Sequence, residues 1–165
     1  MRGEEDMLVQ GEIVINRPVD EVFDFVADER NEPKYNPQMT RAELVTEVPI
    51  GVGTEFHVMT TGVGHAADMT IVYTEFDRPR RLGSATHISN MDINGTLVFE
   101  AQGRSTKMKW LWNIEPRGFL KLLGPIVRRM GERQEVAIWT GLKKVMEAEA
   151  APGLPGGSCA HPDEG

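Results

Sequence analysis

Apolar and polar residues alternate along most of the first 115 positions of this chain, and that period of two predicts β-strands. Near the start, residues 8–16 alternate, and the set running from Val9 to Ile15 is the more apolar one, as in a half-buried strand. The clearest alternation lies in residues 106–114, where Met108, Trp110 and Trp112 share one face with Ile114. We therefore expect this face to point inward.

The segments between these two strands predict two short helical stretches and five further strands. Pro18 fits a first helical position, and apolar residues at helical spacing follow it to about residue 27. Another turn or two of helix is expected around residues 32–36. The strands are expected at about residues 42–46, 56–60, 66–76, 82–88 and 96–101. Asn94-Gly95 is a strong hairpin signal and predicts a turn before the strand at 96–101.

Residues 119–150 have the pattern of one long amphipathic helix. Apolar residues recur at helical spacing from Val127 to Ala148, and the opposite face is charged. Pro125 cannot donate a backbone hydrogen bond, so the helix should start or kink there. Gln134 falls near the centre of the predicted apolar face, and Gly141 lies two turns further on. A mostly β chain that ends in such a helix suggests a sheet gripping the helix around a cavity.

Composition and charge narrow the class of protein. A chain of 165 residues predicts one domain at 1–150, followed by a Pro- and Gly-rich tail at 151–165 that we expect to be disordered. The net charge of −7 argues against nucleic acid and disfavours an anionic membrane surface as partners. The single Cys159 excludes an internal disulfide and fits a reducing compartment. With no signal-peptide pattern and no apolar run of the ~20 residues that span a bilayer, we expect a cytoplasmic protein.

Common catalytic and metal-binding motifs are absent from the sequence. It contains no G-x-S-x-G, P-loop, G-x-G-x-x-G or H-E-x-x-H pattern. His65 and Asp68 should point to opposite faces of a strand, so we expect no metal pair and no metal site. His57 and His87 fall opposite the apolar residues of their strands, which favours surface imidazoles. No cofactor is expected.

The order of elements is one strand, two short helices, six antiparallel strands and a long helix, which is the helix-grip arrangement of an α+β protein. Five stretches carry a family resemblance, namely EIVINRPVDEVFDFVAD, EPKYNP, VPIGVGTEF, VYTEFDRPRRL and GPIVRRMGERQEVAIWTGLKKVMEAE. Over about residues 9–150 they resemble the SRPBCC superfamily, specifically its bacterial polyketide cyclase/dehydrase and lipid-transport branch. The resemblance implies a seven-stranded curved sheet and a deep cavity for a hydrophobic or aromatic small molecule. It does not imply one activity.

The candidate ligand-binding residues are those expected to face this cavity from the sheet and the long helix. They are Phe56, Val58, Met69, Ile71, Tyr73, Met108, Trp110, Trp112, Met130, Gln134, Ile138 and Gly141. For most of the aromatic and sulfur-containing ones plain core is the favoured interpretation, while some should line an open space because the inner face of the sheet exceeds what one helix covers. The Tyr73 hydroxyl either reaches the cavity or bonds a backbone group, and Gln134 is satisfied either by another side chain or by ligand or water. For Gly141, our preferred hypothesis is that it leaves room for the ligand.

Three functions remain open on the sequence alone. The first is a binding or carrier protein for an aromatic, polyketide-like or lipid-like molecule. The second is a cyclase or dehydratase without metal or nucleotide, with Tyr73 and Gln134 as weak catalytic candidates. The third is an adaptor for a quinone-related or ribosomal partner, as the resemblance allows. Because the sequence shows no convincing pair of carboxylates in the cavity, we favour binding. A homodimer is compatible with the sequence.

Overall fold

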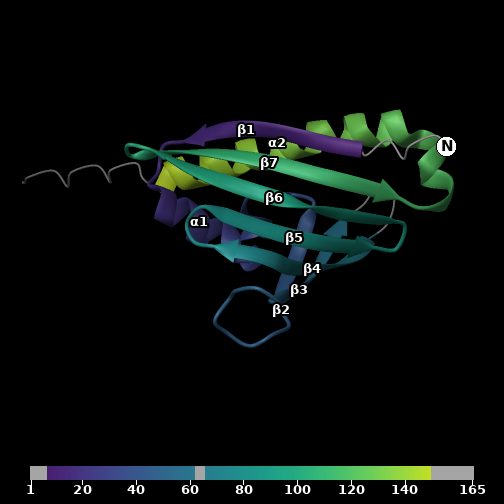
Figure 1. Cartoon of the computed structure of the whole chain (residues 1–165), viewed down its shortest axis with the longest axis horizontal. Helices are drawn as coiled ribbons and strands as arrows, with labels where there is room; N and C mark the ends of the chain where they lie inside the picture. Colours follow the sequence, from purple (N-terminus) through teal and green to yellow (C-terminus); the bar gives the residue numbers. More distant parts are fainter. Residues whose placement is uncertain (1–6, 62–65, 150–165) are drawn as a thin grey trace, which may run out of the picture.

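The computed structural model describes residues 7–61 and 66–149. Three short helical segments and one long helix accompany seven strands (Figure 1). The strands are β1 (Met7–Ile15), β2 (Met39–Leu44), β3 (Glu55–Thr61), β4 (Ala66–Asp77), β5 (Arg81–Ile88), β6 (Met91–Gln102) and β7 (Ser105–Pro116). The helices are α1 (Val19–Ala27), the 3₁₀ segments η1 (Glu29–Lys34) and η2 (Gly118–Leu123), and α2 (Gly124–Glu149).

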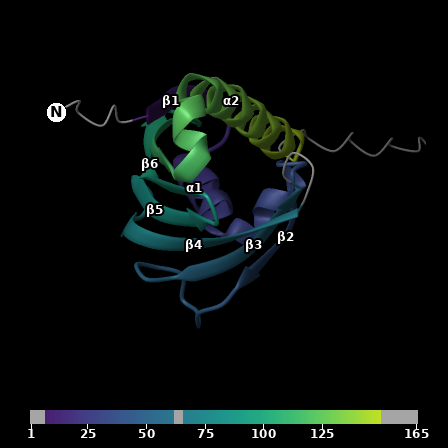
Figure 2. The same ribbon diagram turned by 90° about the vertical axis from the view of Figure 1, so that its right-hand side faces the viewer.

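All seven strands form one antiparallel sheet in the order β1-β7-β6-β5-β4-β3-β2. The sheet curves, and α2 lies along β1 at one edge (Figure 2). Lys143 Nζ donates to the Val14 carbonyl oxygen at 2.7 Å on this side. On its other side α2 meets the segment before β2, where Gln134 Nε2 donates to Gln38 Oε1 at 2.6 Å. The helix therefore joins the two edges of the sheet, as the helix-grip arrangement requires.

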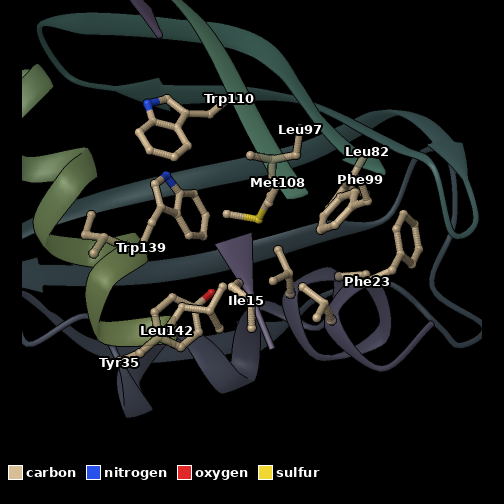
Figure 3. Close-up of a cluster of buried hydrophobic side chains, with 14 of the residues drawn as sticks. Ile15, Phe23, Tyr35, Leu82, Leu97, Phe99, Met108, Trp110, Trp139 and Leu142 are labelled. Carbon is tan, nitrogen blue, oxygen red and sulfur yellow. The ribbon is translucent and has the colours of Figure 1, made fainter. Parts of the chain in front are cut away.

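A packed aromatic core fills the end of the sheet next to α1. Phe23 of α1 is fully buried, and its ring meets Phe76 at 5.3 Å and Phe99 at 5.1 Å, both edge to face. The core continues towards α2 through Met108, Trp110, Trp139 and Leu142 (Figure 3). The apolar set of β1 and the row beginning at Met108 face inward, as the alternation predicts.

The predicted helix-grip fold is confirmed, with seven strands, two short helices after β1 and a long C-terminal helix. The predicted turn at Asn94-Gly95 is wrong. Both residues lie inside β6, and the turn falls at Ser89-Asn90 between Ile88 and Met91. Packing explains why position 95 is a glycine, because a Cβ there would overlap the Leu111 carbonyl oxygen of β7. The glycine permits a close strand approach rather than a turn.

The buried face of α2 is rotated from the one that the sequence predicts. Its buried residues are Ile138, Trp139, Leu142 and Met146, whereas Met130 and Ala137 are exposed. The bulk of Trp139 and Met146 decides the orientation, because these large side chains gain most from burial. Gly131 and Glu135 occupy the same inner face of α2 and interrupt its apolar pattern. For this reason the hydrophobic spacing in the sequence does not predict this face as the buried one. None of the helices in residues 7–61 and 66–149 is long and apolar enough to cross a membrane.

Candidate functional site

The middle of the sheet has an inner face that α2 does not fully cover. One row across the sheet pairs Ile71 with Thr86, Thr86 with Ile93, and Ile93 with Ile114. The two ends of this row are buried, but Thr86 and Ile93 between them keep accessible surface. Several inward-facing residues of the adjoining rows also keep accessible surface. We call this set the open inner face, and its members are Met69, Ser84, Thr86, Ile93 and Trp112.

Most of the predicted ligand-binding residues lie in packed core instead. Seven of them are at most 7% exposed, namely Phe56, Val58, Ile71, Tyr73, Met108, Trp110 and Ile138. Only Met69 and Trp112 of the predicted set belong to the open inner face. The two neighbouring tryptophans of β7 therefore differ. Trp110 is buried against Trp139, with ring centroids 6.2 Å apart, while Trp112 remains half-buried.

Three carboxyl groups come together inside the molecule. Glu29 and Glu32 belong to η1, and Glu135 of α2 lies close enough for the charge of Glu32 to raise its pKa. The charge of Glu32 also raises the pKa of Glu29. Asn36 Nδ2 donates to Glu32 Oε1 at 2.8 Å. Among the ion pairs of the described residues, none involves any of these three acids, so the group lacks a compensating cation.

Glu29 is linked to the predicted candidate Tyr73. The Tyr73 hydroxyl donates to the Ala27 carbonyl oxygen at 2.8 Å and lies 3.1 Å from Glu29 Oε1. Burial is the main cause that raises the pKa of Glu29 well above its ordinary value. Burial also raises the pKa of Tyr73 well above its ordinary value. Of the two roles open to Tyr73, the structure shows the backbone hydrogen bond.

Glu135 is held by two tryptophans. Both Trp112 Nε1 and Trp139 Nε1 donate to Glu135 Oε2 at 2.8 Å. Burial raises the pKa of Glu135 to about 7, against the opposing effect of the two indole donors. At neutral pH this carboxyl is thus close to half protonated. It can donate or accept a proton without a large energetic cost.

The carboxyl group of Glu135 faces the interior of the molecule. The side chain keeps some accessible surface, yet burial is the largest cause of its raised pKa. The same combination holds for Glu29. The hydrogen bonds from Trp112 and Trp139 hold the carboxyl group of Glu135 against the inner side of β7 and α2. Since Trp112 belongs to the open inner face and bonds Glu135, the apolar surface and the acids adjoin.

The remaining predicted residues on α2 have other surroundings. Gln134 is exposed and bonded to Gln38, so another side chain satisfies it and its predicted place inside the apolar face is wrong. The hypothesis that Gly141 leaves room is also wrong. A Cβ there would overlap the Tyr35 carbonyl oxygen, so the glycine permits close contact between α2 and the chain after η1. Met130 is 52% exposed.

The histidines do not form a site within the described residues. His57 and His87 are exposed, as expected, and lie 3.8 Å and 2.7 Å from Asp68 and Asp92. His65 and the tail at 151–165 lie outside the described residues. Residues 7–61 and 66–149 contain no group of three or more His, Cys, Asp or Glu side chains arranged to hold a metal ion.

Comparison with known families decides the classification. Residues 7–147 match the model of the family described as polyketide cyclase / dehydrase and lipid transport. The chain belongs to this family. Its place in the SRPBCC superfamily, predicted from five sequence stretches, is therefore confirmed. A search of curated protein sequences gave no match.

Solved structures of similar fold include both enzymes and proteins of unstated activity. The Zhui aromatase/cyclase from Streptomyces sp. R1128 is 15% identical, with a TM-score of 0.77 over 89% of this chain and 98% of that one. A protein from Thermus thermophilus is 19% identical, with a TM-score of 0.76 over 87% and 99%. A START superfamily protein from Mycobacterium smegmatis is 11% identical, with a TM-score of 0.75 over 86% and 98%. At these identities the likeness shows the fold alone.

The buried acids are the feature that sequence reasoning missed. Glu29 and Glu32 follow α1 in a run of polar residues that looks like an ordinary surface loop. Glu135 stands next to Gln134, and a small error in the orientation of α2 placed it outside the site. The available signal was the spacing of Gly131, Glu135, Trp139 and Leu142, which puts a glutamate between large buried residues on one helical face.

Proposed function

We propose that this protein binds a hydrophobic small molecule, aromatic, polyketide-like or lipid-like, against the open inner face. The proposal rests on one observation above all, the row in which Thr86 and Ile93 stay accessible between buried Ile71 and Ile114. Apolar surface that remains uncovered in the middle of an inward face favours a ligand in that place. Membership of a cyclase and lipid-transport family supports the same conclusion.

The acids define the polar end of the proposed ligand. Glu29, Glu32 and Glu135 adjoin the open inner face, and no cation among the described residues neutralises them. A hydroxyl or amine group on the ligand would satisfy these carboxyl oxygens, because both are hydrogen-bond donors. The aromatic ring of Trp112, fixed by its bond to Glu135, gives the remainder of the ligand a flat apolar surface. The expected ligand is thus apolar with at least one donor group.

A fluorescence titration with N-phenyl-1-naphthylamine, an uncharged apolar probe, tests the proposal. The native chain should bind about one probe molecule with saturation, as expected for one enclosed site. Thr86→Phe adds bulk to the open inner face and should fold normally but weaken binding by about tenfold or more, the usual consequence of losing ~1.4 kcal/mol. Asn94→Phe is the matched control, because Asn94 is exposed on the outer face next to Ile93. Equal affinities for the two variants would contradict the proposed site.

A second candidate function is a cyclase or dehydratase whose substrate lies against the same open inner face. One observation favours it: the pKa of Glu135 is about 7, and burial raises the pKa of Glu29 well above its ordinary value. Two carboxyls in different protonation states are the groups that proton transfer at a carbonyl compound requires. In this mechanism Glu135 would remove a proton and Glu29 would donate one to the departing hydroxyl, so that water leaves.

Measurement of substrate turnover distinguishes an enzyme from a carrier protein. If the protein is an enzyme, a β-hydroxy ketone with an aromatic group should lose one water in its presence, as followed by mass spectrometry. Glu135→Gln should then abolish conversion while N-phenyl-1-naphthylamine still binds. If the protein is a carrier, the compound should be recovered unchanged from both variants. The bound probe and the chemical step are thus tested independently.

A further inference from the structure

A series of exposed apolar residues marks the beginning of the C-terminal helical region. Phe119 and Leu122 of η2 are 73% and 78% exposed, and Ile126 and Met130 of α2 are 57% and 52% exposed. They are spaced by three or four residues, so they recur about once per helical turn. The first buried residue of α2 is Ile138. The start of this region, which lies at the end of the molecule that faces the viewer in Figure 2, therefore carries apolar side chains that remain more than half exposed.

The same stretch is strongly basic although the chain is acidic overall. Residues 117–133 contain Arg117, Lys121, Arg128, Arg129 and Arg133 against the single Glu132. The net charge of the whole chain is −7. Arg117 pairs with Asp92 and Arg128 pairs with Glu132. The ion pairs of the described residues include neither Lys121 nor Arg129 nor Arg133. Three cations here are thus available to an external anion.

The exposed apolar residues and the cations meet in one hollow. An open pocket of about 590 Å³ is lined by Pro125, Ile126, Arg129, Met130 and Arg133. Its wall combines apolar side chains with two guanidinium groups, which bind phosphate through paired N–H donors. The pocket thus matches a molecule with an anionic group attached to apolar chains.

We propose that residues 117–133, the basic amphipathic segment, dock on an anionic lipid surface. Helical segments with Lys and Arg beside exposed Phe, Leu, Ile and Met lie in the membrane interface, where apolar side chains enter the acyl region and cations meet lipid phosphates. The expectation from net charge, which disfavours an anionic membrane, overlooks this local concentration of positive charge.

Two other occupants fit the segment less well. In a symmetric pair of chains each copy would present the same surface, so two positively charged segments would face each other. An acidic protein would satisfy the cations. However, the apolar side chains stand out along a continuous stretch, and a fluid interface can accommodate such protruding groups without a matching groove.

Flotation of the full-length chain with vesicles tests the proposal. At low salt the protein should bind vesicles of phosphatidylglycerol and phosphatidylcholine, and bind phosphatidylcholine alone at least tenfold more weakly. Arg129→Glu with Arg133→Glu, and Phe119→Ser with Leu122→Ser, should each reduce binding by at least tenfold. Val48→Ser with Val52→Ser is the matched control, since these valines are both 69% exposed elsewhere on the molecule. Their replacement should leave binding unchanged.

Two results would overturn the proposal. One is the absence of binding to anionic vesicles at low salt. The other is binding that depends on the arginines but not on Phe119 and Leu122, which would point to a purely electrostatic partner such as an acidic protein. The Thr86→Phe variant keeps this outcome separate from the proposed function. It should lose the probe but dock on vesicles normally, because the open inner face and the basic amphipathic segment share no residue.

Discussion

Gly141 of α2 touches the backbone of Tyr35 so closely that a Cβ at position 141 would overlap the Tyr35 carbonyl oxygen. Tyr35 follows η1, which carries Glu29 and Glu32, while α2 carries Glu135. The glycine therefore sets the distance between the two elements that bring the three acids together. The Tyr35 ring adds to this contact and lies 6.2 Å from the ring of Trp139, as centroids.

The first prediction concerns the stability of this contact. Gly141→Ala should lower the free energy of unfolding by roughly 1–3 kcal/mol, because the new methyl group displaces a backbone segment. Gly131→Ala is the matched control in the same helix. A Cβ there meets the flexible end of Ile114 at 3.3 Å, so the substitution should be neutral or stabilise by about 0.4–1 kcal/mol. Denaturant unfolding of the two variants measures the difference, and equal stabilities would show that α2 can shift freely at position 141.

The second prediction is a pH dependence caused by Glu135. Its pKa rises from 4.5 to about 7 on folding, so between these values the folded state binds more protons than the unfolded state. Stability should therefore be highest below pH 4.5 as far as this group is concerned, and fall as the pH rises through 7. The total loss is on the order of 3 kcal/mol.

Glu135→Gln should remove this loss and be more stable than the native chain at pH 8. Glu149→Gln, an exposed acid at the end of the same helix, is the control and should keep the native pH profile. The comparison requires unfolding free energies of all three proteins from pH 5 to pH 8. Parallel curves for the native chain and Glu135→Gln would show that Glu135 is ionised throughout and is not buried as described.

The third prediction uses the difference between two tryptophans. Trp112 lies on the open inner face, whereas Trp110 is 4% exposed and packs against Trp139. Trp112→Phe should remove most of the fluorescence change that a bound apolar molecule causes, with little loss of affinity. Trp110→Phe should retain that change and instead lower stability, since it leaves a void in packed core. If Trp110→Phe alone removed the fluorescence change, the ligand would lie on the side of the core that we describe as closed.

The fourth prediction concerns the bond between Gln134 and Gln38. This bond is exposed, so its loss in Gln134→Ala should reduce stability by less than about 1 kcal/mol. It also links α2 to the segment before β2, and ligand exchange requires some separation of the elements around the site. Dissociation of N-phenyl-1-naphthylamine should therefore be faster in Gln134→Ala, as measured by stopped-flow fluorescence. Thr140→Ala serves as a control on the same helix. An unchanged dissociation rate would exclude this bond from the exit route.

The sequence predicted the architecture well, because alternation in strands such as β7 and the order of elements are local signals. The sequence pattern assigned the wrong residues of α2 to the site, because it did not predict the orientation of this helix. Met130, Gln134 and Ala137 form a plausible apolar face, but the packing of Trp139 and Met146 turns α2 away from it. That outcome depends on contacts with distant strands and is invisible in local spacing.

The acids could not be placed from sequence either. Glu29 and Glu32 look like surface residues in the sequence, and the effect of the Glu32 charge on the pKa of Glu135 acts between residues more than 100 positions apart. The role of Gly141 could not be predicted from the sequence either, since a glycine inside a helix is compatible with open space or with close contact. Only the position of the Tyr35 carbonyl oxygen distinguishes these two cases.

Intermolecular NOEs can show whether a ligand lies against the open inner face. With N-phenyl-1-naphthylamine bound to the methyl-labelled chain, NOEs should connect the probe to the methyl groups of Met69, Thr86 and Ile93. They should be absent for Met130 and Ile126, which line the outer pocket. NOEs confined to Met130 and Ile126, with none to Thr86 or Ile93, would contradict the account and place the ligand outside the sheet.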